Sequence, residues 1–262
     1  YEANYKDIEP NLFKKDKMGD YLYFNEDIND AIPSQIPNFD VCCGGFPCQP
    51  FSIAGLRRGF EDTRGTLFFS IANIIKHKIE AGYPPRVLFL ENVRGLKNHD
   101  KGNTLKVILA TLEELGYGYS YEVLNAKYFG VPQNRERIFI VCFDKNQVDE
   151  NIDFTFPQKI KLTKTIQDCI DYSLTDEKLF YTEKMSHYDE LVKEIVSKKT
   201  IYQWRRQYVR ENKSNVCPTL TANMGTFPDR VPIILDDYGI RKITPYECLA
   251  LQGFPKDFKF PK

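Results

Sequence analysis

A cysteine, a glutamate and two arginines stand at the borders of apolar runs, where one cleft could hold them. Cys48 follows a run that ends in two glycines, and Glu91 closes another run. Arg135 and Arg137 stand at the start of a third. Ligands of open α/β sheets bind at the carboxyl ends of strands. A thiolate can act as a nucleophile, a carboxyl group as a proton donor and a guanidinium as a clamp for oxygen. The set predicts covalent catalysis.

The elements that position these residues alternate between strand and helix. Thr244 and Pro245 form an N-cap and first-turn pair that predicts a helix to about Leu251. Earlier in the chain, periodicity predicts strands over 39–43, 86–91, 119–124 and 137–143, and helices over 66–78 and 104–115. Such alternation is typical of an α/β fold with a mainly parallel sheet that helices cover on both faces.

The character of the sequence changes after about Pro157. Lysine- and tyrosine-rich, less periodic sequence follows as far as roughly Leu235, and the earlier character returns at Arg241. We therefore predict a catalytic domain over 1–158, a smaller domain over 159–238, and a return to the catalytic domain over 239–262.

Composition excludes several classes of protein. No apolar run approaches the about 18 residues of a membrane span, and the first residues do not resemble a signal peptide. The seven cysteines include no CxxC pair, which argues against a disulfide framework or a zinc ribbon and favours a cytoplasmic location. The three histidines share no ligand spacing, so we expect no metal. Besides Cys48, we expect the cysteines to pack in the interior, Cys42 and Cys43 within the first strand.

Six short motifs carry a resemblance to a known family. They are Pro-Cys-Gln at 47–49, Arg-Gly-Thr-Leu-Phe-Phe at 64–69, Glu-Asn-Val at 91–93, Gln-Asn-Arg-Glu-Arg at 133–137, Thr-Leu-Thr-Ala at 219–222, and the segment 241–255. In this order they resemble the DNA cytosine-5 methyltransferases of the bacterial restriction–modification type. The resemblance implies a Rossmann-like catalytic domain that uses S-adenosylmethionine, joined to a smaller target recognition domain.

The resemblance assigns roles to the cysteine, the glutamate and the two arginines that one cleft could hold. Cys48 would add to carbon 6 of a cytosine that has left the DNA stack, because this addition activates carbon 5. Glu91 would donate to N3 of the ring, and Arg135 and Arg137 would order the base and its pocket. Two further residues would lie on a mobile loop that closes over DNA, Gln49 and Ser52.

Cofactor positions follow from the same resemblance. Asp27 and Ile28 would meet the adenine of S-adenosylmethionine, and Pro47 and Leu67 would line the same site. Two family motifs have no match here: the N-terminal Phe-x-Gly-x-Gly loop and the C-terminal Gly-Asn-Ser/Ala-Val segment. We therefore expect residues 1–262 alone to bind S-adenosylmethionine weakly or not at all.

DNA contacts are expected from the smaller domain. Thr219 and Leu220 resemble the end of the target recognition domain. Arg205 and Arg206 belong to a basic strip over 198–213 that could contact phosphates, although a solvated surface would have the same composition. The net charge of zero does not by itself indicate a nucleic-acid partner. The partners implied are duplex DNA and, in the same system, a restriction endonuclease without direct contact.

Two other functions remain open. The first is tRNA cytosine-5 methylation, which uses the same chemistry. That branch usually carries a Cys-Phe-Thr signature in its last third, and this sequence has none there. The second is a catalytically silent DNA-binding fragment without a cofactor site, which tight binding of S-adenosylmethionine would exclude.

Overall fold

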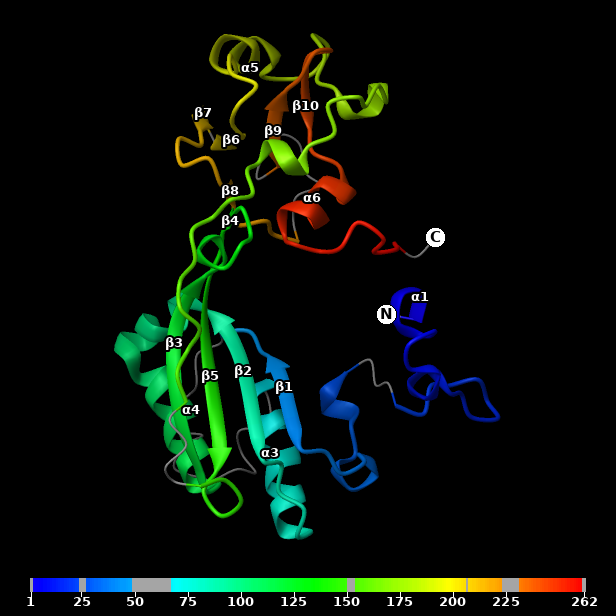
Figure 1. The fold of residues 1–262 in the computed structure, drawn as a ribbon, viewed down its shortest axis with the longest axis vertical. Coiled ribbons are helices and arrows are strands. Elements are labelled where there is room, and N and C mark those ends of the chain that lie inside the picture. Colours follow the sequence, from blue (N-terminus) through cyan, green and yellow to red (C-terminus); the bar gives the residue numbers. More distant parts are fainter. Residues whose placement is uncertain are drawn as a thin grey trace. The chain divides into compact units, whose positions relative to one another are not determined.

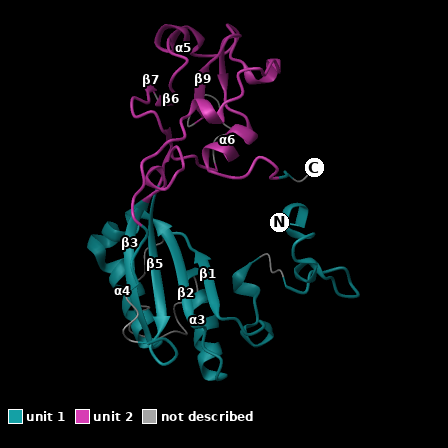
Figure 2. Ribbon diagram, viewed as in Figure 1, with its two compact units in different colours: residues 1–124, 136–157, 259–262 teal, residues 125–135, 158–258 magenta. Residues whose placement is uncertain are grey.

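A computed structural model describes most of the chain as two compact units. The described residues are 2–23, 27–48, 67–149, 154–205, 207–222 and 231–260. Unit 1 comprises residues 1–124, 136–157 and 259–262, and unit 2 comprises residues 125–135 and 158–258. Figure 2 colours the two units separately. One of the changes from unit 1 to unit 2 falls between residues 157 and 158, and residues 125–135 also belong to unit 2.

Unit 1 is built on a four-stranded sheet with helices packed against it. The strand order is β1-β2-β5-β3, and β1 and β2 run parallel whereas β2 and β5 run antiparallel. The bounds are Val41–Gly45 for β1, Val87–Val93 for β2, Tyr117–Asn125 for β3 and Glu136–Asp144 for β5. Helices α3 (Leu67–Glu80) and α4 (Asn103–Glu114) lie behind the sheet in Figure 1.

Alternation along the strands places the core of unit 1 between the sheet and these helices. Leu88 and Leu90 of β2, and Ile138 of β5, are fully buried against Ile75 and Ile108 of the two helices. Side chains on the opposite face of the sheet are partly exposed, among them Val41, Cys43, Phe89 and Val93. The prediction that Cys43 lies in the core is therefore wrong: strand alternation turns it to the face that α3 and α4 do not cover.

Short helical elements complete unit 1. They are α1 (Glu2–Tyr5), η1 (Pro10–Phe13), η2 (Ile28–Asp30), η3 (Pro33–Gln35) and η4 (Arg94–Gly102). Helix α4 ends at Glu114, and Gly116 follows with a φ of +89°, a left-handed conformation that glycine adopts without a steric cost. Among the helices that the structure describes, none is long and apolar enough to cross a membrane.

Unit 2 contains a second four-stranded sheet in the order β10-β9-β6-β7, in which neighbouring strands run antiparallel. Its strands are β6 (Tyr202–Arg205), β7 (Tyr208–Glu211), β9 (Pro232–Leu235) and β10 (Ile240–Lys242). A separate parallel pair joins β4 (Gln133–Asn134) to β8 (Cys217–Pro218). The helices are α5 (Tyr188–Glu194), α6 (Pro245–Leu251), η5 (Ala126–Tyr128), η6 (Gln167–Cys169) and η7 (Glu177–Leu179).

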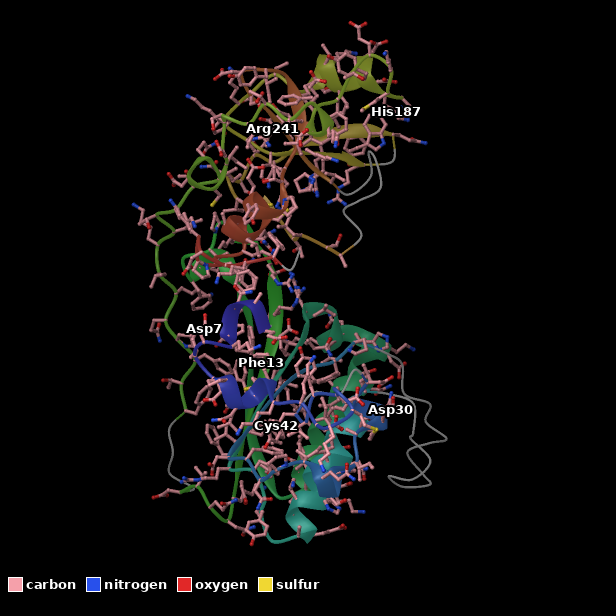
Figure 3. The ribbon with its side chains drawn as sticks, turned by 90° about the vertical axis from the view of Figure 1, so that its right-hand side faces the viewer. Asp7, Phe13, Asp30, Cys42, His187 and Arg241 are labelled. Atoms are coloured by element: carbon pink, nitrogen blue, oxygen red, sulfur yellow. The ribbon has the colours of Figure 1, made fainter. Side chains whose placement is uncertain are left out.

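A buried arginine connects β10 to α6 inside unit 2 (Figure 3). Arg241 has no exposed surface, and its guanidinium donates to Asp236 at 2.6 Å and to both carboxylate oxygens of Glu247. Glu247 also closes a capping box with Thr244, which confirms the predicted start of this helix. Segment 239–258, which the sequence assigns to the catalytic domain, packs within unit 2 because this network holds it there.

Candidate active site at the ends of strands β1 and β2

An ion pair joins two of the predicted catalytic residues at one end of the sheet. The Nε of Arg137 lies 2.7 Å from Oε1 of Glu91, and their side chains are 17% and 33% exposed. Because β2 and β5 are antiparallel, the start of β5 lies at the carboxyl end of β2. Two residues 46 positions apart in sequence therefore meet, and their pairing leaves a carboxylate held by an arginine in a partly desolvated position.

A glycine of β1 makes room for this carboxylate. Gly45 is the register partner of Glu91 in the parallel β1–β2 pair. A Cβ atom added to Gly45 would lie 3.2 Å from Oε2 of Glu91, which is tighter than ordinary van der Waals contact. The end of β1 therefore favours a residue without a side chain, because Glu91 occupies the space above it.

Cys48 lies three residues beyond the end of β1, on a segment that β2 holds in place. Asn92 is 2% exposed and donates from Nδ2 to the backbone oxygen of Phe46 at 2.8 Å. The Phe46 ring packs against Phe68 of α3 with centroids 5.3 Å apart. Cys48 is half-buried and packs against the same core, and burial raises the pKa of its thiol. Backbone and ring contacts thus fix the approach to the predicted nucleophile.

The predicted cofactor residues of unit 1 gather around the first turns of α3. Asp27 caps η2 by accepting from the backbone nitrogen of Asn29 at 2.9 Å. The hydroxyl of Ser70 in α3 donates to the Asn29 side chain at 2.7 Å. Ile28 and Leu67 are partly buried and pack against the same hydrophobic core as Cys48. Pro47 is exposed beside Cys48.

Three predicted residues lie outside the described residues: Gln49, Ser52 and Arg206. Arg135 belongs to unit 2, where its backbone nitrogen donates to Gln133 and its backbone oxygen accepts from Ala126. Its predicted partner Arg137 belongs to unit 1. The two arginines of the Gln-Asn-Arg-Glu-Arg motif therefore belong to different units. Arg137 forms the ion pair with Glu91.

The predicted DNA-contacting residues of unit 2 differ in burial. The hydroxyl of Thr219 donates to the backbone oxygen of Asn134 at 2.7 Å, which joins two of the sequence motifs. Arg205 is exposed at the end of β6. Leu220 is 6% exposed and packs in a hydrophobic cluster of unit 2. The Leu220 side chain thus lies in the interior of unit 2, and its DNA contact stays a prediction.

The aromatic residues of the basic strip are also partly internal. Tyr202 and Trp204 are buried in the core of unit 2, whereas Tyr208 is exposed. Lys198 pairs with Asp237 on the surface. On the β6–β7 hairpin, Arg205, Tyr208 and Arg210 therefore share one face, and Tyr202 and Trp204 lie on the other face in the core.

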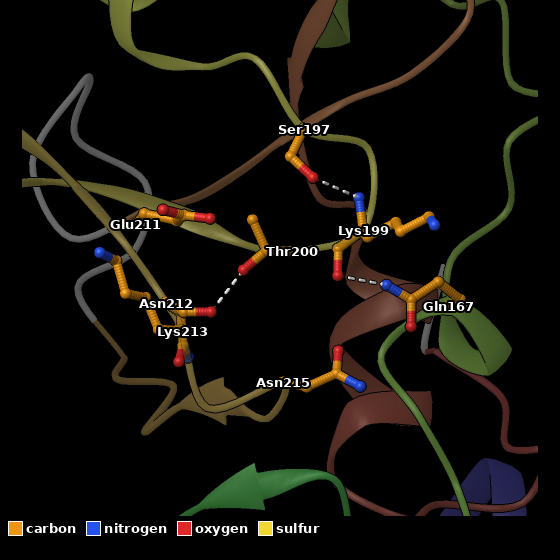
Figure 4. A pocket seen from close by; sticks show the side chains of 8 residues that line it. All are labelled: Gln167, Ser197, Lys199, Thr200, Glu211, Asn212, Lys213 and Asn215. Atoms are coloured by element: carbon orange, nitrogen blue, oxygen red, sulfur yellow. Dashed lines mark hydrogen bonds between the residues drawn. The ribbon is translucent and has the colours of Figure 1, made fainter.

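Two pockets lie beside this hairpin in unit 2. Figure 4 shows the larger, of about 600 Å³, where the Gln167 amide donates to the backbone of Lys199 and the Thr200 hydroxyl to that of Asn212. The second, of about 390 Å³, is lined by the predicted residues Arg205 and Thr219. It also takes in Arg210 of the basic strip and Gln203, which the sequence reasoning missed. Gln203 is buried because β7 and β9 pair with its strand on both sides, and the local sequence carries no signal for this pairing.

Metal coordination has no support among the residues that the structure describes. No group of three or more histidine, cysteine, aspartate or glutamate side chains within these ranges could hold a metal ion. The described part of the site is thus built from a thiol, a carboxylate, a guanidinium and backbone groups.

Known proteins resemble this chain along most of its length. Residues 12–262 match the family model of the C-5 cytosine-specific DNA methylases. Type II methyltransferase M.Bsp6I of Bacillus sp. (strain RFL6) is 52% identical over 241 residues, which cover 90% of this chain and 74% of that protein. M.SsoII of Shigella sonnei is 41% identical over 237 residues, 90% of this chain and 60% of that protein. The chain spans about three-quarters or less of the length of these relatives.

Solved structures show the same fold. Spodoptera frugiperda DNMT2 superposes with a TM-score of 0.62 at 20% identity, over 91% of this chain and 76% of that one. A putative DNA modification methyltransferase encoded within an Escherichia coli prophage gives a TM-score of 0.51 at 19% identity, over 84% of this chain and 70% of that one. The fold is therefore that of the Rossmann-like methyltransferases, as predicted.

The family follows from the sequence relatives. The chain belongs to the C-5 cytosine-specific DNA methylase family. The predicted class of enzyme, a DNA cytosine-5-methyltransferase, is thereby confirmed.

Proposed function

We propose that this enzyme methylates carbon 5 of cytosine within a short, specific duplex DNA sequence. The observation that carries the proposal is the Glu91–Arg137 pair above Gly45, at the end of the sheet from which the Cys48 segment begins. The relatives are named Type II methyltransferases, so we place the enzyme in a restriction–modification system. Its cognate endonuclease would act on the same DNA without needing to contact the enzyme.

Cys48 is the proposed nucleophile. Its thiolate adds to carbon 6 of the cytosine, and the ring electrons then make carbon 5 nucleophilic. After carbon 5 has gained the methyl group it loses its proton to a base, and the thiolate leaves carbon 6 to restore the aromatic ring. The cytosine must leave the DNA stack to reach Cys48, which costs on the order of a few kcal/mol.

Glu91 and Arg137 are the proposed partners of the ring. Glu91 donates a hydrogen bond to N3 and offsets the charge that develops when the thiolate adds. Arg137 holds the Glu91 carboxyl in position through its 2.7 Å contact. Arg135, in the same motif, is proposed to contact the base oxygen or a neighbouring phosphate.

S-adenosylmethionine is the proposed cofactor, and the described residues fit its adenosine end. Ile28 and Leu67 offer partly buried apolar surface, and the Asp27 carboxylate beside them can accept hydrogen bonds from amino or hydroxyl groups. Pro47 would border the same site from the Cys48 segment. The cofactor supplies an electrophilic methyl group on a sulfonium.

DNA recognition is proposed for the smaller predicted domain, 159–238. Arg205 is exposed on its hairpin and would contact phosphate. Thr219, held against Asn134, would contact DNA from the neighbouring motif. Gln49 and Ser52 are proposed contacts from the segment that follows Cys48, and Arg206 from the basic strip of the sequence.

The test presents two substrates to the purified full-length enzyme with S-adenosylmethionine: plasmid DNA and total tRNA. We expect bisulfite sequencing to find 5-methylcytosine in the plasmid at one short recurring sequence. Methylation of tRNA but not of DNA would contradict the proposal in favour of the tRNA alternative. Absence of methyl transfer to both, with cofactor bound, would contradict it in favour of a silent DNA-binding protein.

A further inference from the structure

Gln203 is a buried glutamine on the polar face of the β6–β7 hairpin. Because side chains alternate along a strand, Tyr202 and Trp204 enter the core of unit 2 while Gln203 turns to the opposite face. Its register partner on that face is Arg210 of β7, and its partner on the other side is Pro232 of β9. Neighbouring strands on both sides leave Gln203 only 8% exposed.

The pocket of about 390 Å³ lies beside this buried amide. The hairpin contributes Gln203, Arg205 and Arg210 to its lining, and the segments of the two recognition motifs contribute Asn134, Thr219 and Thr221. Among the lining residues that the structure describes are two guanidinium groups and no carboxylate. The positive charge favours a phosphate-bearing ligand, and the amides and hydroxyls offer donors and acceptors to polar groups that enter.

The Gln203 side chain has no hydrogen-bond partner among the described residues, and its amide atoms keep some surface open to the pocket. Buried polar groups almost always bond a protein group, a water molecule or a ligand. The buried carboxylates of Asp236 and Glu247 in the same unit follow this rule through Arg241. An amide that lines a polar pocket and lacks such a partner is suited to a ligand that displaces its water.

We propose that Gln203 is a specificity-determining residue that hydrogen-bonds a base edge within the recognised DNA sequence, flanked by phosphate contacts from Arg205 and Arg210. The inference rests on the proposed function of DNA cytosine methylation. A carboxamide presents a donor and an acceptor side by side, which suits the pattern of donors and acceptors that base pairs display in the major groove. The two arginines add affinity that does not depend on sequence.

The test replaces the amide and reads sequence preference directly. Full-length wild type, Gln203→Leu and Gln203→Glu are incubated with a pool of duplexes whose positions around a target cytosine are randomised, and methylated products are read by bisulfite sequencing. We expect both variants to lose or change discrimination at one base position by about 10- to 100-fold and to keep it at the others. Thermal unfolding of each variant checks the fold, and Gln203→Glu, which keeps the shape, decides if the leucine variant unfolds.

Gln167→Leu is the matched control. Its amide lies in unit 2 but donates to the backbone of Lys199 and does not line this pocket, so its sequence preference should equal that of wild type. Unchanged preference in a folded Gln203→Glu variant, or an equal loss on every sequence, would overturn the inference while the proposed function stands. Absence of 5-methylcytosine with wild type would instead contradict the proposed function, and this inference with it.

Discussion

At the residue scale, two carboxylate–arginine pairs of unit 1 have similar geometry and different surroundings. Glu91 and Arg137 pair at 2.7 Å with side chains 33% and 17% exposed. Glu136 and Arg94 also pair at 2.7 Å, but their side chains are 38% and 63% exposed. Only the first pair lies above Gly45, near the start of the Cys48 segment. The comparison separates a role in catalysis from the general effect of losing an ion pair.

Glu91→Gln keeps the shape of the side chain and removes the proton that it would donate to N3. We expect the methylation rate to fall at least about 100-fold, the usual scale for loss of a general acid, with DNA binding almost unchanged. Glu136→Gln is the control and should keep near-normal turnover, because an exposed pair contributes little. Normal turnover in Glu91→Gln would mean that another group donates the proton to N3.

Burial of Cys48 gives a pH dependence that can be measured without DNA. Because burial raises the pKa of this thiol, the reactive thiolate should form at higher pH in the folded protein than in the unfolded chain. Alkylation of Cys48 by iodoacetamide, followed by mass spectrometry from pH 6 to 10, should show a midpoint above that of the same residue in urea. A native midpoint at or below the unfolded one would show that the site stabilises the thiolate instead.

At the element scale, the fit between β1 and β2 positions the carboxylate. Gly45→Ala would place a methyl group 3.2 Å from Oε2 of Glu91 and force the carboxylate to move. Since small displacements of catalytic groups are costly, we expect activity to fall by about 10- to 100-fold with little change in thermal stability. Gly95→Ala is the control, because a Cβ atom there meets nothing closer than 3.9 Å. Equal activity of the Gly45→Ala and Gly95→Ala variants would show that the close contact at Gly45 does not position the Glu91 carboxylate.

The elements of unit 2 depend on a charged network rather than on apolar contacts alone. Arg241→Met would leave the carboxylates of Asp236 and Glu247 buried without their cation. We expect the free energy of unfolding of unit 2 to fall by about 3–5 kcal/mol in urea denaturation. Arg94→Met, which breaks an exposed pair, should unfold like wild type. A loss of less than about 1 kcal/mol in Arg241→Met would show that the network contributes little.

The elements themselves could largely be predicted from local pattern. Apolar runs and helical periodicity indicated β1, β2, β3, β5, α3 and α4, and the Thr244–Pro245 pair indicated α6. The Cys43 error has a simple cause: an apolar run does not say which strand face a helix will cover, and β1 turns Cys43 to the exposed face. The burial of Leu220 could not be predicted for the same reason, because its neighbours in the core come from distant segments.

At the scale of the whole molecule, short motifs were enough to identify the family. The contacts between residues of different motifs depend on strand pairing, which the motifs do not encode. The sequence singled out Glu91 and Arg137 separately, whereas the antiparallel register of β2 and β5 brings them into contact. Gly45 and Asn92 owe their importance to register and to a bond with the Phe46 backbone. The pocket beside Gln203 depends on strands far apart in sequence, and no local pattern could have revealed it.

The central claim, that Cys48 attacks carbon 6 of cytosine in DNA, has one direct test. Duplex DNA that carries 5-fluorocytosine at the methylated position is incubated with the full-length enzyme and S-adenosylmethionine, and the products are separated under denaturing conditions. Fluorine at carbon 5 cannot leave as a proton does, so the bond between sulfur and carbon 6 persists. We predict an adduct with wild type that mass spectrometry maps to Cys48, and none with Cys48→Ser. An adduct that survives this substitution, or one that maps to another residue, would contradict the account.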